Sequence, residues 1–483
     1  MKEKFRYVKK EDRKKILLLC DDIRVHSGVG IMAKEIVVGT AHHFNWLNVG
    51  AAIQHPEAGK GIDISTEINK LAGIEDSWVR ILPNNGYGDA NLIRRLIKEE
   101  KPDAIMIFTD PRYWVWLFEL EREIRNEIPL FYLNIWDDLP APLYNRSYYE
   151  SCDLLMAISK QTKAINEIVL GDKASEKIIK YVPHGINEDY FFPIREGHEN
   201  YELLQEFKKN LFQGKEIDYV VFFNSRNIRR KSPGDIILAY RHFCDSIGKE
   251  KAAKCALVMH TQAVDQNGTD LNAVREVLCD PEYVNVFFSQ DRLETPQMNL
   301  LYNIADVNVL ISSNEGWGLS LTEAMMSGTM IIANVTGGMQ DQMRFVDEKG
   351  EWINFSPDFP SNHRGTYRKC GEWAVPVFPS NISLVGSVPT PYIFDDRCKP
   401  EEVAEAIADV YYMGKEERDR RGLLAREWVT SEESGMSARK MGVNVIEACD
   451  EAFEKFKPRS RFDVIKVEDR PLGYKYITHK LKY

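Results

Sequence analysis

The sequence predicts an α/β protein with two doubly wound domains of parallel β-sheet that face each other across a cleft. The 483 residues are too many for one ordinary hydrophobic core, so two domains are expected. Apolar runs at 16–20 and 219–223 are each followed by a polar loop and a helical pattern, as at the start of a doubly wound sheet. Another run, 307–312, leads through a glycine-rich turn and a short helix to a strand at 330–333, which indicates parallel pairing.

The composition limits the class of protein. Apolar residues make up 44% and charged residues 28%, as in soluble globular proteins. The net charge of −10 argues against a protein that coats nucleic acid. The eight cysteines are scattered without a Cys-x-x-Cys pair, which predicts neither a disulfide scaffold nor a zinc site and favours a reducing cytoplasm. The charged N-terminus predicts no signal peptide, and no apolar run is long enough to predict a membrane span.

Glycines close the loop after the first strand. The loop 21–30 ends in Ser27-Gly28-Val29-Gly30 before a helix expected at 31–38. At the first strand–helix turn of a doubly wound domain, glycines let a ligand approach the backbone. Gly28 and Gly30 are therefore candidate ligand contacts, although a plain tight turn would also explain them because the full Gly-x-Gly-x-x-Gly pattern is absent.

The strand expected at 130–135 ends in Trp136-Asp137-Asp138. Ligands of open α/β sheets bind beyond the carboxyl ends of the strands. Asp137 is therefore a candidate general base for a ligand hydroxyl. A helix-cap or turn role for the aspartate pair is an equal alternative, and adjacent aspartates do not match the spaced Asp-x-Asp of a metal site.

A polar segment at 194–215 is expected to link the domains, and the loop after the strand 219–223 carries several cations. Arg226 and Lys231 stand in the spacing Arg-x4-Lys. Two fixed cations would stabilise negative charge on a leaving phosphate, and arginine offers it bidentate geometry. The alternative is a basic surface loop, and Arg229 and Arg230 are interpreted as residues of this kind.

The stretch from Glu315 to Glu323 carries the most specific pattern. Amide groups at a helix start attract an anion such as a diphosphate, while the two flanking carboxylates can bind hydroxyls. A ligand with phosphate in the middle and hydroxyls at both ends is a nucleotide sugar. An ordinary helix start with acidic residues is the alternative. The residues between the glutamates that would surround this ligand are Gly316, Trp317, Gly318, Leu319 and Ser320.

The Glu-x7-Glu pattern, with Gly-Trp-Gly-Leu-Ser-Leu-Thr between the glutamates, resembles the signature of retaining glycosyltransferases of the GT-B fold, family 4 (glycosyl transferases group 1) type. The Arg-x4-Lys loop and Gly337-Gly338 resemble further motifs of that family, with Ser225 and Ser232 in place of its usual glycines. The resemblance implies two Rossmann-like domains and a C-terminal helix that returns to the first domain. It also implies transfer of a hexosyl or pentosyl group with retention of configuration, without a metal or other cofactor.

Individual roles follow from the resemblance. Glu315 is expected to contact the donor sugar and Glu323 the ribose hydroxyls, while Arg226 and Lys231 bind the diphosphate. The loop that carries Arg292 and Leu293 is expected to meet the nucleobase. Gly28 and Gly30 would border the donor, and Asp137 stands where the family often has an acceptor-side histidine.

The expected domains are an N-terminal acceptor domain (1–195), a linker (196–216), a donor domain (217–436), and a C-terminal helix and tail (437–483) that pack back toward the first domain. An irregular insertion at about 355–399 is expected to cover or extend the cleft and to help select the acceptor. A packed decoration away from the site is the alternative.

The acceptor is the least determined partner. A glycan, a glycolipid or another hydroxyl-bearing polymer is expected, in the cytoplasm or at the periphery of a membrane. The basic termini, 2–15 and 475–483, would then contact anionic lipid or nucleic acid, with a solvated N-terminal arm as the alternative. Alternatives are a glycosyltransferase acting on modified nucleic acid or protein, a non-catalytic nucleotide-sugar-binding module, and a sugar-phosphate isomerase or epimerase. The sequence leaves the oligomeric state open.

Overall fold

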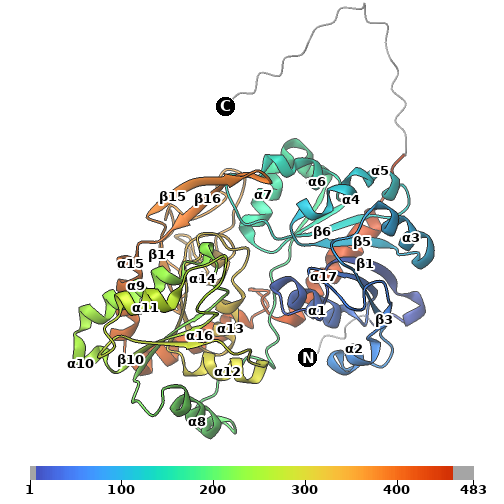
Figure 1. The fold of residues 1–483 in the computed structure, drawn as a ribbon. Helices are drawn as coiled ribbons and strands as arrows, with labels where there is room; N and C mark the ends of the chain where they lie inside the picture. The colour runs from blue at the N-terminus through green and yellow to red at the C-terminus, as the bar shows by residue number, and fades with distance from the viewer. Residues whose placement is uncertain (1–6, 461–483) are drawn as a thin grey trace, which may run out of the picture.

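Two parallel sheets organise the computed structural model, which describes residues 7–460 (Figure 1). The first sheet has eight strands in the order β3-β4-β2-β1-β5-β6-β7-β8. Its central strands β1, β2, β5, β6 and β7 are buried along most of their length, as expected when helices cover both sides of a parallel sheet. Only the edge strand β3 runs antiparallel to its neighbour. The bounds are β1 Lys14–Asp21, β2 Phe44–Ala51, β3 Ile62–Asp63, β4 Val79–Pro83, β5 Ala104–Phe108, β6 Leu130–Asn134, β7 Leu154–Ala157 and β8 Ile178–Tyr181.

The second sheet has six strands in the order β11-β10-β9-β12-β13-β14, and all of its pairs are parallel. In both sheets the strand order reverses around the first strand of the domain, which places a crevice at the carboxyl ends. The bounds are β9 Tyr219–Asn224, β10 Cys255–His260, β11 Asn285–Ser289, β12 Val307–Leu310, β13 Met330–Asn334 and β14 Ala374–Val377.

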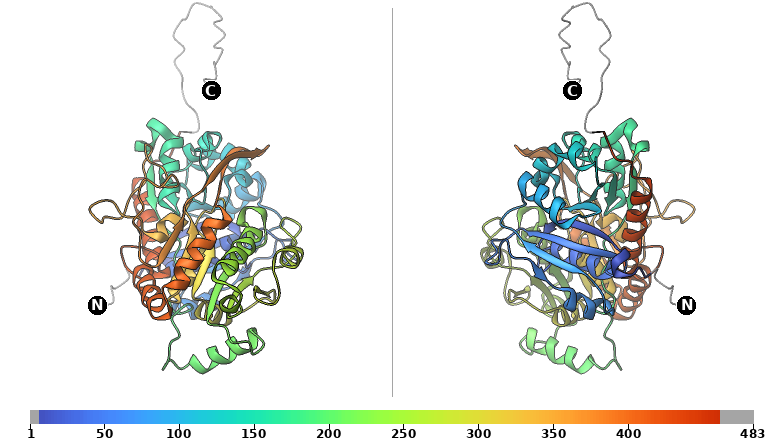
Figure 2. Two further views of the ribbon diagram at one scale, coloured as in Figure 1. Left: turned by 90° about the vertical axis from the view of Figure 1, so that its left-hand side faces the viewer. Right: turned by 90° about the vertical axis from the view of Figure 1, so that its right-hand side faces the viewer.

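Helices connect and cover these strands. The linker helix α8 packs on α12 and lies at the lower edge of the molecule (Figure 2). None of the described helices is at once long and apolar enough to cross a membrane. The bounds are α1 Gly28–Thr40, α2 Ser65–Ala72, α3 Ala90–Glu100, α4 Val115–Glu119, α5 Glu121–Ile124, α6 Arg146–Glu150, α7 Lys160–Leu170, α8 Tyr201–Leu211, α9 Pro233–Ile247, α10 Lys249–Ala252, α11 Leu271–Leu278, α12 Thr295–Ile304, α13 Leu319–Met326, α14 Met339–Met343, α15 Pro400–Tyr412, α16 Lys415–Val429 and α17 Ala438–Lys455.

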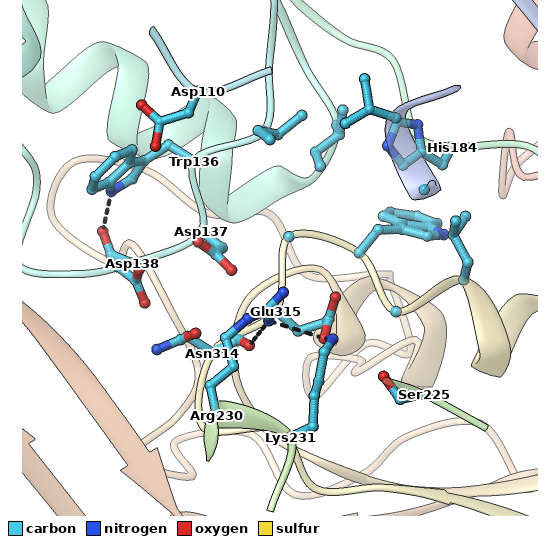
Figure 3. Close-up of a pocket in the computed structure, with 18 of the residues that line it drawn as sticks. Asp110, Trp136, Asp137, Asp138, His184, Ser225, Arg230, Lys231, Asn314 and Glu315 are labelled. Atoms are coloured by element: carbon cyan, nitrogen blue, oxygen red, sulfur yellow. Dashed lines mark hydrogen bonds and ion pairs between the residues drawn. The ribbon is translucent and has the colours of Figure 1, made fainter. Parts of the chain in front are cut away.

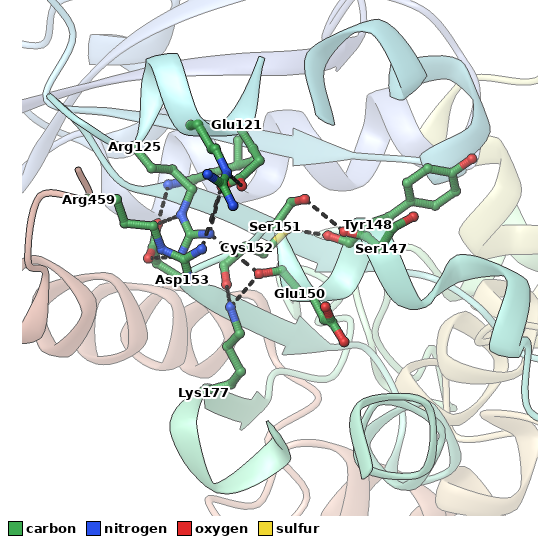
Figure 4. Close-up of polar contacts among 12 residues, drawn as sticks. Glu121, Arg125, Ser147, Tyr148, Glu150, Ser151, Cys152, Asp153, Lys177 and Arg459 are labelled. Carbon is green, nitrogen blue, oxygen red and sulfur yellow. Dashed lines mark hydrogen bonds and ion pairs between the residues drawn. The ribbon is translucent and has the colours of Figure 1, made fainter. Parts of the chain in front are cut away.

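The last helix, α17, returns to the first domain and packs on α1, β7 and β8. A Cβ added at Gly442 would lie 3.1 Å from the carbonyl oxygen of Gly39, so the two helix backbones approach closely there. Beyond α17, the amide of Arg459 donates to the carbonyl of Arg125 at 2.8 Å. Arg125 is buried and its guanidinium binds Asp153 (Figure 4). The chain is thereby fixed to the first domain up to the last described residues, and the basic tail 475–483 lies outside them.

The segment 355–399 is more regular than the sequence predicts. Its strand β14 extends the second sheet beside β13. Two further strands, β15 (Asn381–Ser387) and β16 (Thr390–Arg397), form an antiparallel hairpin outside that sheet. The hairpin reaches from the second domain toward α6 and α7 of the first (Figure 1). The sequence does not predict its register, because the hairpin is held by contacts with both domains, such as those of Asp396 with Ser313 and of Phe394 with Leu139, rather than by a periodic apolar face of its own.

Candidate functional site

A cavity of about 660 Å³ lies between the loops that follow the strands of the two sheets. This volume lies within the range of small-molecule sites. Figure 3 shows side chains of the first domain facing those of the second across it. The charged residues that line the cavity are Asp110, Arg112, Asp137, Asp138, Arg230, Lys231, Glu315 and Glu323.

Two cations and one carboxylate meet on the second-domain side. The chain leaves β9 and forms a 3-10 turn, Arg229–Lys231, before α9. This turn directs the Lys231 ammonium group onto the Glu315 carboxylate, while Arg230 Nη1 lies 3.3 Å from Glu315 Oε2. Arg230 also donates to the carbonyl of Asn314 at 2.6 Å. Burial, together with the charge of Arg230, lowers the pKa of Lys231 well below its ordinary value.

The turn between β12 and α13 is shaped by glycines. Gly318 precedes α13 with φ of 90°, a conformation that favours glycine. A Cβ at Gly337 would lie 2.0 Å from the carbonyl oxygen of Glu315, so the loop after β13 packs directly against the turn. A Cβ at Gly316 would lie 3.1 Å from the carbonyl oxygen of Ile135 in the first domain. The start of α13 is therefore open to the cavity but closely bounded on its other sides.

The carboxylate of Glu323 is hydrogen-bonded to a buried tyrosine. The hydroxyl of Tyr302 donates to Glu323 Oε2 at 2.5 Å and accepts from Asn224 Nδ2 at 2.8 Å. Burial raises the pKa of Glu323, and the hydrogen bond from Tyr302 opposes that rise. One carboxylate oxygen is thus fixed, which orients the group toward the cavity that Glu323 lines.

Carboxyl groups dominate the first-domain side. Burial raises the pKa of Asp137, and burial with the adjacent Asp137 charge raises that of Asp138 well above its ordinary value. Asp110 is paired with Arg112, whose guanidinium lies 5.8 Å from the centre of the Trp136 ring. These groups follow β5 and β6, the strands whose carboxyl ends face the cavity.

A buried histidine lies on the same side of the cavity. Burial lowers the pKa of His184 to about 3, and its ring packs edge-on against those of Phe108 and Trp317. The ring of His184 therefore packs as a neutral group in the wall of the cavity.

Most of the site residues predicted from the sequence meet in this one cavity. They come from loops of both domains, far apart in the chain. Those that line it are Gly28, Asp137, Lys231, Glu315, Gly316, Trp317, Gly318, Leu319, Ser320 and Glu323.

Four predicted residues do not line the cavity. Arg226 extends outward with 65% of its side chain exposed, and its Nε lies 2.9 Å from Asp265 Oδ2. Gly30 is a packing position, since a Cβ there would lie 2.5 Å from the carbonyl oxygen of Val25. Arg292 is exposed and contacts His26 of the first domain. Leu293, next to it, also lies outside the cavity lining.

The structure corrects one assignment and adds several residues. Arg230, taken from the sequence as part of a basic surface, instead lines the cavity as the second cation at Glu315. The pattern Arg-x4-Lys could not reveal this, because the 3-10 turn decides which arginine faces inward. Tyr302 belongs to no sequence motif that would have pointed to the site. Arg112 could have been found as a charged residue just beyond the end of a buried strand.

Residues 205–354 match the family model of glycosyl transferases group 1. The matched segment contains Lys231, Glu315 and Glu323, and it runs from the linker helix to the start of the insertion. A comparison of the chain with curated proteins finds no match.

Solved structures share the fold at low sequence identity. The Anabaena Alr3699/HepE structure, which contains UDP and glucose, has a TM-score of 0.61 and 13% identity, covering 91% of this chain and 100% of that one. A sucrose-phosphate synthase from Thermosynechococcus elongatus has a TM-score of 0.61 and 14% identity, covering 92% and 100%. An α,α-trehalose-phosphate synthase (UDP-forming) from Burkholderia vietnamiensis has a TM-score of 0.57 and 9% identity, covering 91% and 99%. The predicted GT-B architecture of two Rossmann-like domains is confirmed.

Proposed function

We propose that this protein is a metal-independent, retaining glycosyltransferase that moves a sugar from a nucleoside diphosphate sugar to an acceptor hydroxyl. The observation that carries the proposal is the convergence of Lys231 and Arg230 on Glu315 beside the open start of α13. This arrangement supplies positive charge where a diphosphate would bind and a carboxylate where a sugar would bind. The match of residues 205–354 to glycosyl transferases group 1 supports the same reading.

The donor would lie along the second-domain wall. Its diphosphate would bind the first amide groups of α13, which favour an anion, together with Lys231 and Arg230. Glu323, already held on one oxygen by Tyr302, would accept hydrogen bonds from the ribose hydroxyls. Glu315 would accept hydrogen bonds from hydroxyls of the donor sugar.

The reaction breaks the bond between the anomeric carbon and the phosphate oxygen and forms one to the acceptor oxygen on the same face. Negative charge grows on the leaving diphosphate, where the two cations stabilise it. The acceptor proton passes to the leaving phosphate oxygen, and Asp137, which lines the first-domain side of the cavity, would assist its removal.

The donor site can be tested by thermal shift with UDP-, GDP- and ADP-sugars, measured both with EDTA and without it. A ligand at a hundred times its Kd stabilises the folded state by about 2.7 kcal/mol. We expect a shift with one nucleotide and its loss in Glu323→Ala. The control Glu276→Ala, on the exposed face of α11, should keep the shift.

Three outcomes would contradict all or part of the proposal. The absence of a shift with every nucleotide sugar would remove the donor site. Binding without hydrolysis or transfer under any condition would favour a non-catalytic nucleotide-sugar-binding module. A shift that disappears in EDTA would contradict metal independence alone.

A further inference from the structure

The cations of the cavity are already paired with its carboxylates. Of the described residues that line it, three are cationic and five carry carboxyl groups. Arg112 is bound to Asp110, and both Arg230 and Lys231 are bound to Glu315. A donor diphosphate would draw on the latter two cations and would itself add negative charge.

The acceptor half of the cavity contains two further carboxyl groups. Asp137 and Asp138 project from the loop after β6 and face the second domain (Figure 3). Burial and the charge of Asp137 raise the pKa of Asp138 well above its ordinary value, which favours a shared proton on the pair. A pair that shares a proton can donate to one ligand hydroxyl and accept from another. An anion bound beside this pair would be a buried charge without a partner, which is costly. The pair would therefore repel it.

The β15–β16 hairpin supplies the remaining wall of this half. Thr390 and Ile393 of the hairpin line the cavity, and Thr390 Oγ1 contacts the guanidinium of Arg112. The amide of Phe394 donates to the carbonyl of Leu139 in the first domain at 2.6 Å. The hairpin therefore adds a hydroxyl and an apolar side chain to the wall, and its contact with Arg112 leaves that cation with a second partner.

We propose that the acceptor is an uncharged, hydroxyl-bearing molecule that binds between the Asp137–Asp138 pair and the hairpin, and that this site rejects acceptors carrying phosphate. The inference rests on the proposed function, whose acceptor it specifies. A phosphate group on the acceptor would need a cation that the donor diphosphate does not use. Among the described lining residues the cation left for it is Arg112, which is already bound to Asp110.

The test compares acceptors that differ only by a phosphate group. The donor is the nucleotide-glucose that gives the thermal shift, and release of the nucleoside diphosphate is measured with glucose or fructose and with their 6-phosphates at equal concentration. We expect the uncharged sugars to increase release at least tenfold more than their phosphates do. Equal or greater stimulation by the phosphates would overturn the inference, and so would no stimulation by any uncharged sugar.

A charge-removing variant separates electrostatics from shape. Asp138→Asn keeps the size of the side chain but replaces its ionisable carboxyl group with a neutral amide, so we expect the preference for uncharged sugars to fall at least threefold. Asp172→Asn, an exposed change on the same domain, should leave the preference unaltered. An unchanged preference in Asp138→Asn would overturn the role of the aspartate pair. Failure of the proposed function is distinguished by the thermal shift, which would then be absent before any acceptor is added.

Discussion

The ammonium group of Lys231 contacts the carboxylate of Glu315 inside the cavity, although 84 residues separate them in the chain. One residue follows β9 and the other follows β12, and these two strands are neighbours in the sheet. The contact therefore depends on the strand order of the second domain. It places a cation at the start of α13, where an anionic leaving group would be stabilised.

Removing this cation tests its role in transfer. Lys231→Met keeps the chain length and the burial but removes the charge, so we expect kcat to fall by about 10²–10³-fold. The folded state should survive, because Arg230 remains beside Glu315. The measurement is steady-state transfer together with the unfolding midpoint. Wild-type kcat in a folded variant would exclude Lys231 from the chemistry.

The two arginines of the same loop should behave differently. Arg230 contacts Glu315 and the carbonyl of Asn314, whereas Arg226 is mostly exposed and paired with Asp265. Losing a charge-assisted hydrogen bond costs about 1.5–3 kcal/mol, so Arg230→Ala should lower kcat/KM at least tenfold. We expect Arg226→Ala to lower it by less than threefold. The reverse order would mean that the motif spacing, rather than this geometry, locates the diphosphate.

Tyr392 should hold the hairpin on the first domain. Its hydroxyl donates to the carbonyl of Ala141 and accepts from the amide of Leu143, each at 3.2 Å. Because each of the two hydrogen bonds contributes about 1 kcal/mol, Tyr392→Phe should raise the open population of the hairpin about thirtyfold. Faster amide hydrogen exchange of residues 381–397 would reveal this larger open population.

The matched control for the hairpin is Tyr412→Phe, which removes a hydroxyl from a side chain that is 63% exposed at the end of α15. Its exchange across 381–397 should equal that of the wild type. Equal exchange in Tyr392→Phe as well would show that the hydroxyl does not hold the hairpin.

The contact between α14 and the first domain should depend on pH. Asp341 is buried and accepts from the amide of Lys160 at 2.9 Å and from the hydroxyl of Tyr181 at 3.0 Å. Burial raises the pKa of Asp341 to about 6. A raised folded-state pKa gives stability that is present at low pH and is lost as the pH rises through that value.

The free energy of unfolding of the wild type, relative to that of Asp341→Asn, should therefore fall between about pH 4 and pH 7, by at most about 3 kcal/mol. Urea unfolding of both proteins across this range measures it. Asp172→Asn provides the baseline for an exposed aspartate. A difference that rises with pH would contradict the assigned direction.

The sequence by itself determined the secondary-structure elements and the chemical character of the proposed donor site. Apolar runs such as that of β1 are long enough to specify buried parallel strands, and Glu315, Gly318 and Glu323 lie within one strand–turn–helix unit. Features of this kind are local, because the backbone of a few consecutive residues fixes them. Spacing alone therefore located most of the cavity's second-domain wall.

Only the tertiary structure decided which side chains complete the site. The direction of a turn separates Arg230 from Arg226, and the neighbouring helix α12 brings Tyr302 to Glu323. The position of the β15–β16 hairpin depends on contacts with the first domain, including the hydrogen bond between Tyr392 and Ala141. Such pairings depend on distances between segments far apart in the chain, and a single sequence carries no periodic or local signal for them.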